Sequence, residues 1–144
     1  MTAHRSVFSA AGILLAALFL SGCSAPEEPE APIPNANWSL LGQKSPTPQD
    51  TTLQLGVVRA ACAGGRTGDV VSANTEFSTE QVVVTVFVEP LPEGAYDCRM
   101  NDTVPYTVDL GQPLGERELV DGACRNAALA GTAACSQDGL RWKP

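Results

Sequence analysis

Residues 38–144 of the sequence predict an all-β fold, either a small antiparallel β-sandwich or a barrel-like domain with two disulfides. Short segments of alternating apolar and polar residues recur there, separated by turn signals at a spacing of roughly 8–12 residues. No convincing amphipathic helix interrupts them. Four cysteines in the same region form an even set, which indicates two disulfides. The alternative is a single twisted sheet backed by the segment around Trp38.

The first 22 residues have the pattern of a signal peptide. A short polar start that includes Arg5 precedes an apolar run from Val7 to Leu20, and two small residues follow it. The run is shorter than the roughly 20 apolar residues that a transmembrane helix needs, and polar residues flank it on both sides. We therefore expect residues 1–22 to be removed on export.

The apolar run ends in Leu20-Ser21-Gly22-Cys23, which resembles the lipobox of bacterial lipoproteins. The resemblance implies that the Cys23 thiol receives a diacylglycerol, that cleavage follows on its amino side, and that acyl chains such as palmitate anchor the protein. Two chains, at roughly 0.8 kcal/mol per buried CH₂, hold a small domain stably where one chain does not. The expected location is the extracytoplasmic face of the cell membrane. In a cell with two membranes, Ser24 leaves open which membrane carries the anchor, although an aspartate there would favour the inner one.

Residues 23–37 predict a disordered tether between the lipidated cysteine and the domain. Its sequence, SAPEEPEAPIPNAN after the cysteine, is rich in Pro, Glu and Ala and cannot build a core. Such a composition favours a semi-extended chain. The remaining residues, 38–144, are enough for one domain but not for two.

The predicted strands follow from alternation and from turn residues. The strongest segment has four valines on one face and Val83, Thr85 and Phe87 on the other, which is typical of a central strand. A short loop with one helical turn is expected over residues 123–134. The expected strands are Leu53–Arg59, Asp69–Phe77, Gln81–Glu89, Pro105–Leu110 and Glu118–Asp121, with short edge pieces at Tyr96–Cys98 and Leu140–Trp142.

The cysteines of the domain, Cys62, Cys98, Cys124 and Cys135, allow three disulfide connectivities. The favoured pairing is Cys62–Cys98, which ties the end of one strand to a segment after the next hairpin, with Cys124–Cys135 closing a local loop. In the chain-entropy model each disulfide stabilises the fold by roughly 3 to 4 kcal/mol. A zinc ion held by the four thiolates is the alternative, although the sequence lacks a Cys-x-x-Cys pair.

Two stretches, PYTVDL at residues 105–110 and PLGERELVDG at residues 113–122, resemble a pattern of small exported proteins and lipoproteins of actinobacteria. The strand ending at Cys62-Ala63-Gly64-Gly65 and the valine-rich strand extend the likeness over about residues 53–122. The resemblance implies a single-membrane cell and supports the Cys62–Cys98 pairing, but it brings no activity with it. Cys124 and Cys135 are an addition to the pattern of these actinobacterial proteins, so the resemblance says less about the C-terminal end of the chain.

Charge and histidine content exclude several classes of function. The only histidine, His4, lies in the expected leader, so histidine triads, histidine metal sites and imidazole pH switches are excluded from the mature protein. Loss of Arg5 leaves 8 basic and 16 acidic residues, a formal charge of −8. This charge argues against nucleic acid and against direct adhesion to anionic lipid. No cofactor is indicated.

The segment LGERELVDG offers a candidate binding pair, Arg117 with Asp121. The same residues also have a structural interpretation. In it Gly115 turns the chain, Leu119 and Val120 are buried, and Arg117 pairs with a nearby carboxylate that orders the turn.

Two catalytic groupings are conceivable without histidine. Glu116 with Asp121 has the residue types of a carboxylate-based hydrolase, whose mechanism depends on the separation of the two groups. Lys44 with Ser45 has the residue types of a Ser-Lys dyad, in a Pro-rich segment. Neither spacing is specific, so we expect that the protein is not an enzyme.

By elimination, the sequence favours a binding or structural module of the cell envelope, with an envelope protein or glycan as partner. An exposed aromatic patch with Trp142 or Tyr96 would favour binding, and uniformly polar faces would favour a spacer. A solute- or metal-binding domain is the alternative. Asp97, Asp102 and Asp109 have the oxygen atoms that a hard cation such as calcium takes, but their spacing matches no recognised calcium loop, so no metal site is predicted from them.

Overall fold

The computed structural model describes residues 33–42 and 44–144, so the predicted leader, Cys23 and most of the predicted tether lie outside the described residues. The described chain is built mainly of strands, which confirms the predicted all-β class. The strands are β1 (Ala36–Leu40), β2 (Thr52–Arg59), β3 (Val70–Phe77), β4 (Gln81–Val88), β5 (Val104–Asp109), β6 (Glu118–Asp121) and β7 (Leu140–Trp142). Two short 3₁₀ segments, η1 (Gly122–Arg125) and η2 (Ala133–Gly139), stand between β6 and β7.

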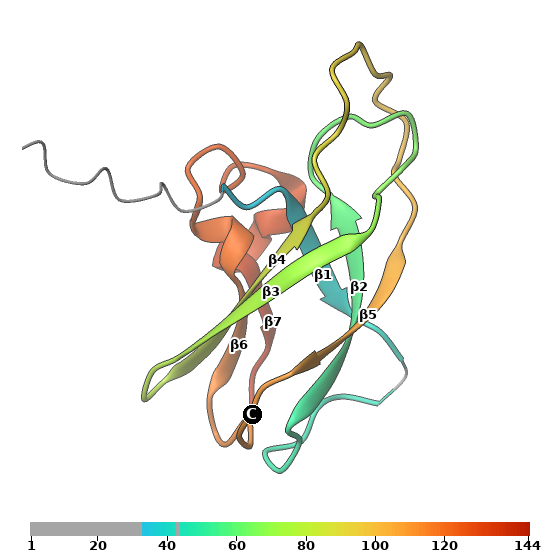
Figure 1. Ribbon diagram of the computed structural model, residues 1–144. Helices are drawn as coiled ribbons and strands as arrows, with labels where there is room; N and C mark the ends of the chain where they lie inside the picture. Colours follow the sequence, from blue (N-terminus) through green and yellow to red (C-terminus); the bar gives the residue numbers. More distant parts are fainter. Residues whose placement is uncertain (1–32, 43) are drawn as a thin grey trace, which may run out of the picture. The chain divides into compact units, whose positions relative to one another are not determined.

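The strands form two sheets that face each other as a sandwich (Figure 1). One sheet has the order β1-β2-β5 and is antiparallel, and the other has the order β3-β4-β6-β7. In the second sheet β4 and β6 pair in parallel, so the sheet is mixed where the sequence predicted antiparallel strands. The reason is topological, because the chain leaves β4, passes through β5 in the other sheet, and returns beside β4 in the same direction.

The core lies between the two sheets and follows the predicted alternation. Leu53, Leu55 and Val57 of β2 are buried, while Gln54 between them is exposed. The four even-numbered valines of β4 face the same core. The remaining core residues are Ala36, Trp38, Val108, Leu110, Leu114 and Leu119.

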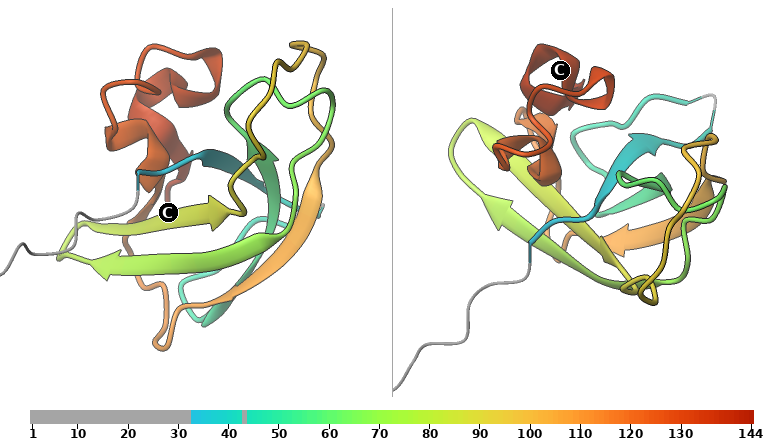
Figure 2. Two further views of the ribbon diagram at one scale, coloured as in Figure 1. Left: turned by 45° about the horizontal axis from the view of Figure 1, so that its top comes forward. Right: turned by 90° about the horizontal axis from the view of Figure 1, so that it is seen from above.

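The opposite face of β4 is buried as well, which explains why both of its faces are apolar. Val83 and Phe87 are only 4% and 8% exposed, although they point away from the core. Figure 2 shows the two 3₁₀ segments gathered on one side of the sandwich, close to β4. Gly122 packs so tightly on Thr85 and Val83 that a Cβ at this position would fall on the Thr85 hydroxyl. The central position predicted for this strand is confirmed.

Both favoured disulfides are present. Cys62–Cys98 joins the segment after β2 to the segment before β5, and Cys124–Cys135 joins η1 to η2. The edge strand predicted at Leu140–Trp142 is confirmed as β7. The edge strand predicted at Tyr96–Cys98 is wrong, because this stretch is a loop. The disulfide to Cys62 holds it in place, and it pairs with none of the described strands.

The fold begins earlier than the composition predicted. The Asn35 side chain bonds both the N–H and the C=O of Val88, at 2.9 and 2.8 Å. Ala36 is fully buried and is paired with Arg59 of β2. The predicted boundary after Asn37 is therefore wrong, because backbone pairing with a neighbouring strand holds β1 although its first residues have a weak strand propensity.

Candidate functional site

Asp121, the last residue of β6, is fully buried, and its carboxylate accepts four hydrogen bonds. Oδ2 accepts from the Trp38 N–H at 3.0 Å, from Asn37 Nδ2 at 3.3 Å and from Arg141 Nη2 at 2.7 Å. Oδ1 accepts from the Ala123 N–H at 3.0 Å and so caps η1. The side chain points inward because it lies two residues after a core residue of the same strand. It thereby reaches the free edge of β1 in the other sheet.

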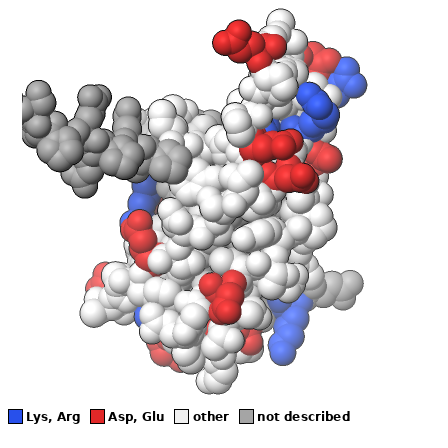
Figure 3. All heavy atoms as spheres, in the orientation of Figure 1, with Lys and Arg blue, Asp and Glu red and all other residues white. Residues whose placement is uncertain are grey.

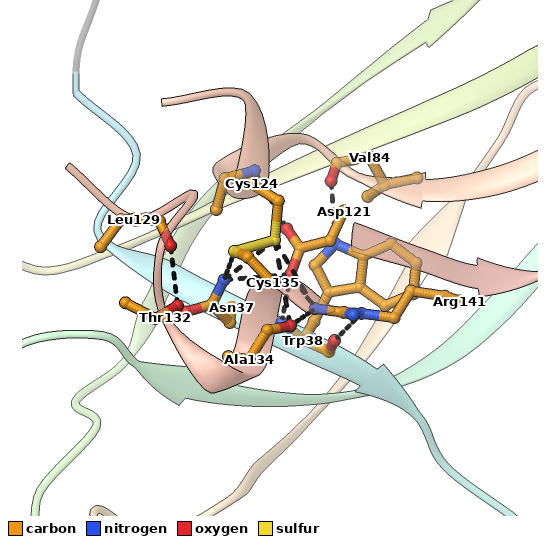
Figure 4. A network of polar contacts seen from close by, with 11 residues as sticks. Asn37, Trp38, Val84, Asp121, Cys124, Leu129, Thr132, Ala134, Cys135 and Arg141 are labelled. Carbon is orange, nitrogen blue, oxygen red and sulfur yellow. Dashed lines mark hydrogen bonds and ion pairs between the residues drawn. A yellow bond between two sulfur atoms is a disulfide. The ribbon is translucent and has the colours of Figure 1, made fainter. Parts of the chain in front are cut away.

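Arg141 of β7 completes this arrangement (Figure 4). Its Nε donates to the Trp38 carbonyl at 2.6 Å, and its Nη2 donates to the Ala134 carbonyl at 2.8 Å as well as to Asp121. Its guanidinium carbon lies 5.8 Å from the centre of the Trp38 ring, within cation–π range. We call Asp121, Arg141 and Asn37 the clasp, because together they join the edge of one sheet to β6 and β7 of the other.

Asn37 contributes both a used and an unused polar atom to the clasp. Its Nδ2 donates to Asp121 and lies 3.7 and 3.5 Å from the sulfurs of Cys124 and Cys135. A carboxylate only accepts hydrogen bonds, so the amide nitrogen, and not its oxygen, must face Asp121. Among the described residues, neither Asn37 Oδ1 nor Arg141 Nη1 has a hydrogen-bond partner. Asn37 Oδ1 and Arg141 Nη1 therefore take no part in the hydrogen bonds of the clasp.

A hollow of about 350 Å³ lies beside the clasp, on the face of β1 and β2 that points away from the core. This volume is at the lower end of the range for small-molecule sites. Its walls are mostly apolar, with Asn37 and Arg141 as the principal polar groups. Its lining residues are Asn37, Trp38, Ser39, Gly56, Val58, Ala134 and Arg141.

The structure does not bring the predicted pair Arg117 and Asp121 together. Arg117 donates to the carbonyls of Leu114 and Pro113, at 2.8 and 2.6 Å, and its guanidinium carbon lies 4.8 Å above the Phe77 ring. Asp121 is engaged in the clasp. The predicted partner of Arg117 was therefore wrong, since backbone carbonyls and an aromatic ring replace the carboxylate, although the side chain does hold the turn.

The candidate catalytic groupings are also separate. Glu116 is exposed and lines two shallow surface hollows, whereas Asp121 is buried in the clasp and lines neither of them. Lys44 and Ser45 are both exposed in the connection between β1 and β2, and no hydrogen bond between described residues joins them. The structure assembles neither the carboxylate pair nor the dyad.

The three candidate calcium ligands have separate partners. The guanidinium of Arg99, 2.5 Å from the Asp97 carboxylate, lowers the pKa of that carboxyl. Asp102 accepts from the Thr67 N–H at 2.6 Å, and Asp109 accepts from a backbone N–H two residues further on. No group of three or more His, Cys, Asp or Glu side chains is placed to hold a metal ion within the part of the chain that the structure describes. Among the described residues, these three carboxylates therefore do not come together as a calcium site.

The two aromatic residues that were expected to mark a binding patch are half-buried. Trp142 packs against the core, and the Tyr96 hydroxyl donates to a backbone carbonyl at 2.9 Å. Among the residues that the structure describes, Met100 has the most exposed large apolar side chain. On the face drawn in Figure 3, charged side chains lie mainly toward the two ends of the domain, and much of the middle is uncharged.

Sequence reasoning missed Asn37 and Arg141. Asn37 falls in a segment whose composition suggested a tether, and no local pattern links it to a residue 84 positions away. Arg141 left no signal either, because side chains of a strand alternate between its faces, and an arginine between Leu140 and Trp142 therefore has the pattern of a solvent-facing residue.

Comparison of the chain with protein-family models, with curated proteins and with solved structures finds no match. The resemblance to exported proteins of actinobacteria therefore stays a prediction. None of the helices among the described residues has the length and apolar character needed to cross a membrane.

Proposed function

We propose that this chain is a lipoprotein of the bacterial cell envelope, whose β domain is anchored through Cys23 at the extracytoplasmic face of the membrane and serves as a binding module. The cysteine pairing carries this proposal. The chain has five cysteines, and the four in the domain pair with one another. Cys23 therefore has no cysteine in the chain left to pair with, and it stands where a lipobox places the acylated residue. Disulfides in a small domain also favour an oxidising compartment outside the cytoplasm.

The point where the chain enters the domain supports an anchored arrangement. The carbonyl of Asn35 accepts from the Ala60 N–H at 3.0 Å, so the chain enters beside the end of β2. From Cys23 to Ile33 is about ten residues, which span at most about 35 Å when fully extended. An anchor at Cys23 would keep this entry point within about that distance of the lipid.

The hollow beside the clasp supports binding as the role of the domain. It lies on the surface of a sandwich stiffened by two disulfides, and its polar groups are held in place by buried partners. Held groups lose little conformational freedom when a ligand binds, which favours affinity. We propose an envelope component or a small solute as the ligand.

Metabolic labelling with an alkyne-bearing palmitate, followed by intact mass spectrometry of the detergent-extracted protein, tests the anchor. We expect label in the wild-type chain and a product cut before Cys23. Cys23→Ser should lose the label, whereas Ser24→Ala, a change at the adjacent position, should keep it. An unlabelled wild-type protein, or a product cut at another position, would contradict the proposal.

A further inference from the structure

The hollow beside the clasp holds a matched acceptor and donor. Asn37 is 8% exposed, its amide nitrogen is used inside the clasp, and its Oδ1 lacks a partner among the described residues. Arg141 uses Nε and Nη2 within the clasp, which leaves the N–H groups of Nη1 without a described partner. Neither atom is among the fully buried ones without a partner, so both reach the solvent side of the clasp, where a ligand can contact them.

The charge balance of the clasp favours a neutral partner. Asp121 neutralises Arg141 at 2.7 Å, and both side chains are largely or wholly removed from solvent. An anion placed near Arg141 would also meet the carboxylate, and a cation near Asn37 would meet the guanidinium. A neutral group with its own donor and acceptor avoids both repulsions.

The walls favour a small group with an apolar substituent. Gly56, Val58 and Ala134 line the hollow and offer no charged atom, and the volume is about 350 Å³. A secondary amide presents one N–H and one C=O, and an adjoining methyl group would contact apolar walls of this kind.

We propose that this hollow binds a neutral ligand through a secondary amide, whose N–H donates to Asn37 Oδ1 and whose carbonyl accepts from Arg141 Nη1. The inference rests on the proposed binding function and names its ligand class. Acetamido groups of N-acetylated sugars and the amides of short peptides share this chemistry. The two sources differ in what surrounds the amide, so separate probes distinguish them.

Titration of the ¹⁵N-labelled protein, extracted in detergent micelles in the form that the cell makes, tests the proposal by NMR. The two probes are N-acetylglucosamine and N-acetylalanine methylamide. We expect at least one of them to cause saturable shifts at the backbone amides of Ser39, Val58 and Ala134. Glucose, which lacks the acetamido group, and the fully N-methylated peptide, which lacks N–H donors, should bind about tenfold more weakly or worse, as expected for the loss of one hydrogen bond.

Two matched variants locate the site. Val58→Trp fills the hollow from the outward face of β2 and should abolish the saturable shifts. Gln54→Trp adds the same ring to the same face of the same strand, outside the hollow, and should leave binding within about twofold of wild type. If Val58→Trp does not fold, the difference in affinity between each probe and its analogue without the amide N–H still tests the proposal.

The proposal is overturned if neither probe gives saturable shifts, if the analogues without the amide N–H bind equally well, or if folded Val58→Trp binds like wild type. Binding of the sugar alone assigns a glycan source, and binding of the peptide alone assigns a peptide source. Acylation of Cys23 is measured separately, so failure here leaves the proposed anchor standing. Failure of the labelling experiment would leave any binding measured here unchanged.

Discussion

Arg141→Met should destabilise the domain severely, because it removes the counter-ion of a buried carboxylate. The Asp121 side chain is 0% exposed and lies 2.7 Å from Nη2 of Arg141. Removing one partner of a buried ion pair costs about 3–5 kcal/mol. Asp121 would retain three other donors, namely the N–H groups of Trp38 and Ala123 and the Asn37 amide, so we expect a loss near the lower limit, about 3 kcal/mol.

A loss of this size is large for a small domain, whose total stability is about 5–15 kcal/mol. It corresponds to a fall in Tm of about 10–20 °C. Urea denaturation at pH 7 with the disulfides intact, followed by tryptophan fluorescence, measures it directly. Trp38 contacts the clasp, so its emission reports on the region that is perturbed.

Lys143→Met is the matched control. Lys143 pairs with Glu118 at 3.0 Å, but the two side chains are 69% and 31% exposed. Ion pairs exposed to solvent contribute about 0–1 kcal/mol, so this variant should lose less than about 1 kcal/mol. If Arg141→Met costs no more than Lys143→Met, the clasp does not stabilise the fold and the reasoning above fails.

Three further changes test other parts of the fold. Gly122→Ala should cost about 1–3 kcal/mol in urea denaturation, because the new methyl group meets the Thr85 hydroxyl, and adding Thr85→Ala should recover most of the loss. Trp38→Phe removes an indole N–H that donates to a β4 carbonyl at 2.8 Å, and thermal unfolding should show a loss of about 1–3 kcal/mol. The hydrogen bond from the Thr47 N–H lowers the pKa of the Asp50 carboxyl. This hydrogen bond therefore stabilises the fold above the ordinary pKa of a carboxyl, about 4, and the stabilisation is lost as the pH falls through the lowered pKa. Asp50→Asn should therefore be less stable than wild type at pH 7, and the difference in urea midpoint should disappear at low pH. A difference that persists unchanged would contradict this assignment.

The strands that local pattern predicted best are those in which the spacing of apolar residues and the strand propensity agree. In β2 the apolar residues alternate with polar ones, and in β4 valine occupies every second position, so period and propensity agree. Both disulfides were also favoured correctly, because each joins segments that lie near the ends of predicted elements.

The errors share a different cause. The parallel pairing of β4 with β6 depends on the path of the chain through the other sheet, which alternation within a segment does not encode. The start of the domain was placed at Trp38, two residues after β1 begins, because β1 is held by pairing with β2 and the segment before it by the Asn35 contacts with Val88. The partner of Arg117 was wrong because two carbonyls of the turn accept from it, and the path of the backbone that places them there cannot be inferred from the residue types alone.

The sequence by itself determined the all-β class, the central valine-rich strand, the even set of domain cysteines and the lipobox-like segment around Cys23, because each of these is written in neighbouring residues. Only the tertiary structure decided which polar groups meet. Asn37, Asp121 and Arg141 lie on three strands of two sheets, and the first two are separated by 84 positions. Asp121 and Arg141 pair across neighbouring strands of one sheet, whereas Asn37 and the backbone of Trp38 reach them only because the sandwich closes there. These hydrogen bonds from the other sheet help to offset the cost of burying a carboxylate and a guanidinium.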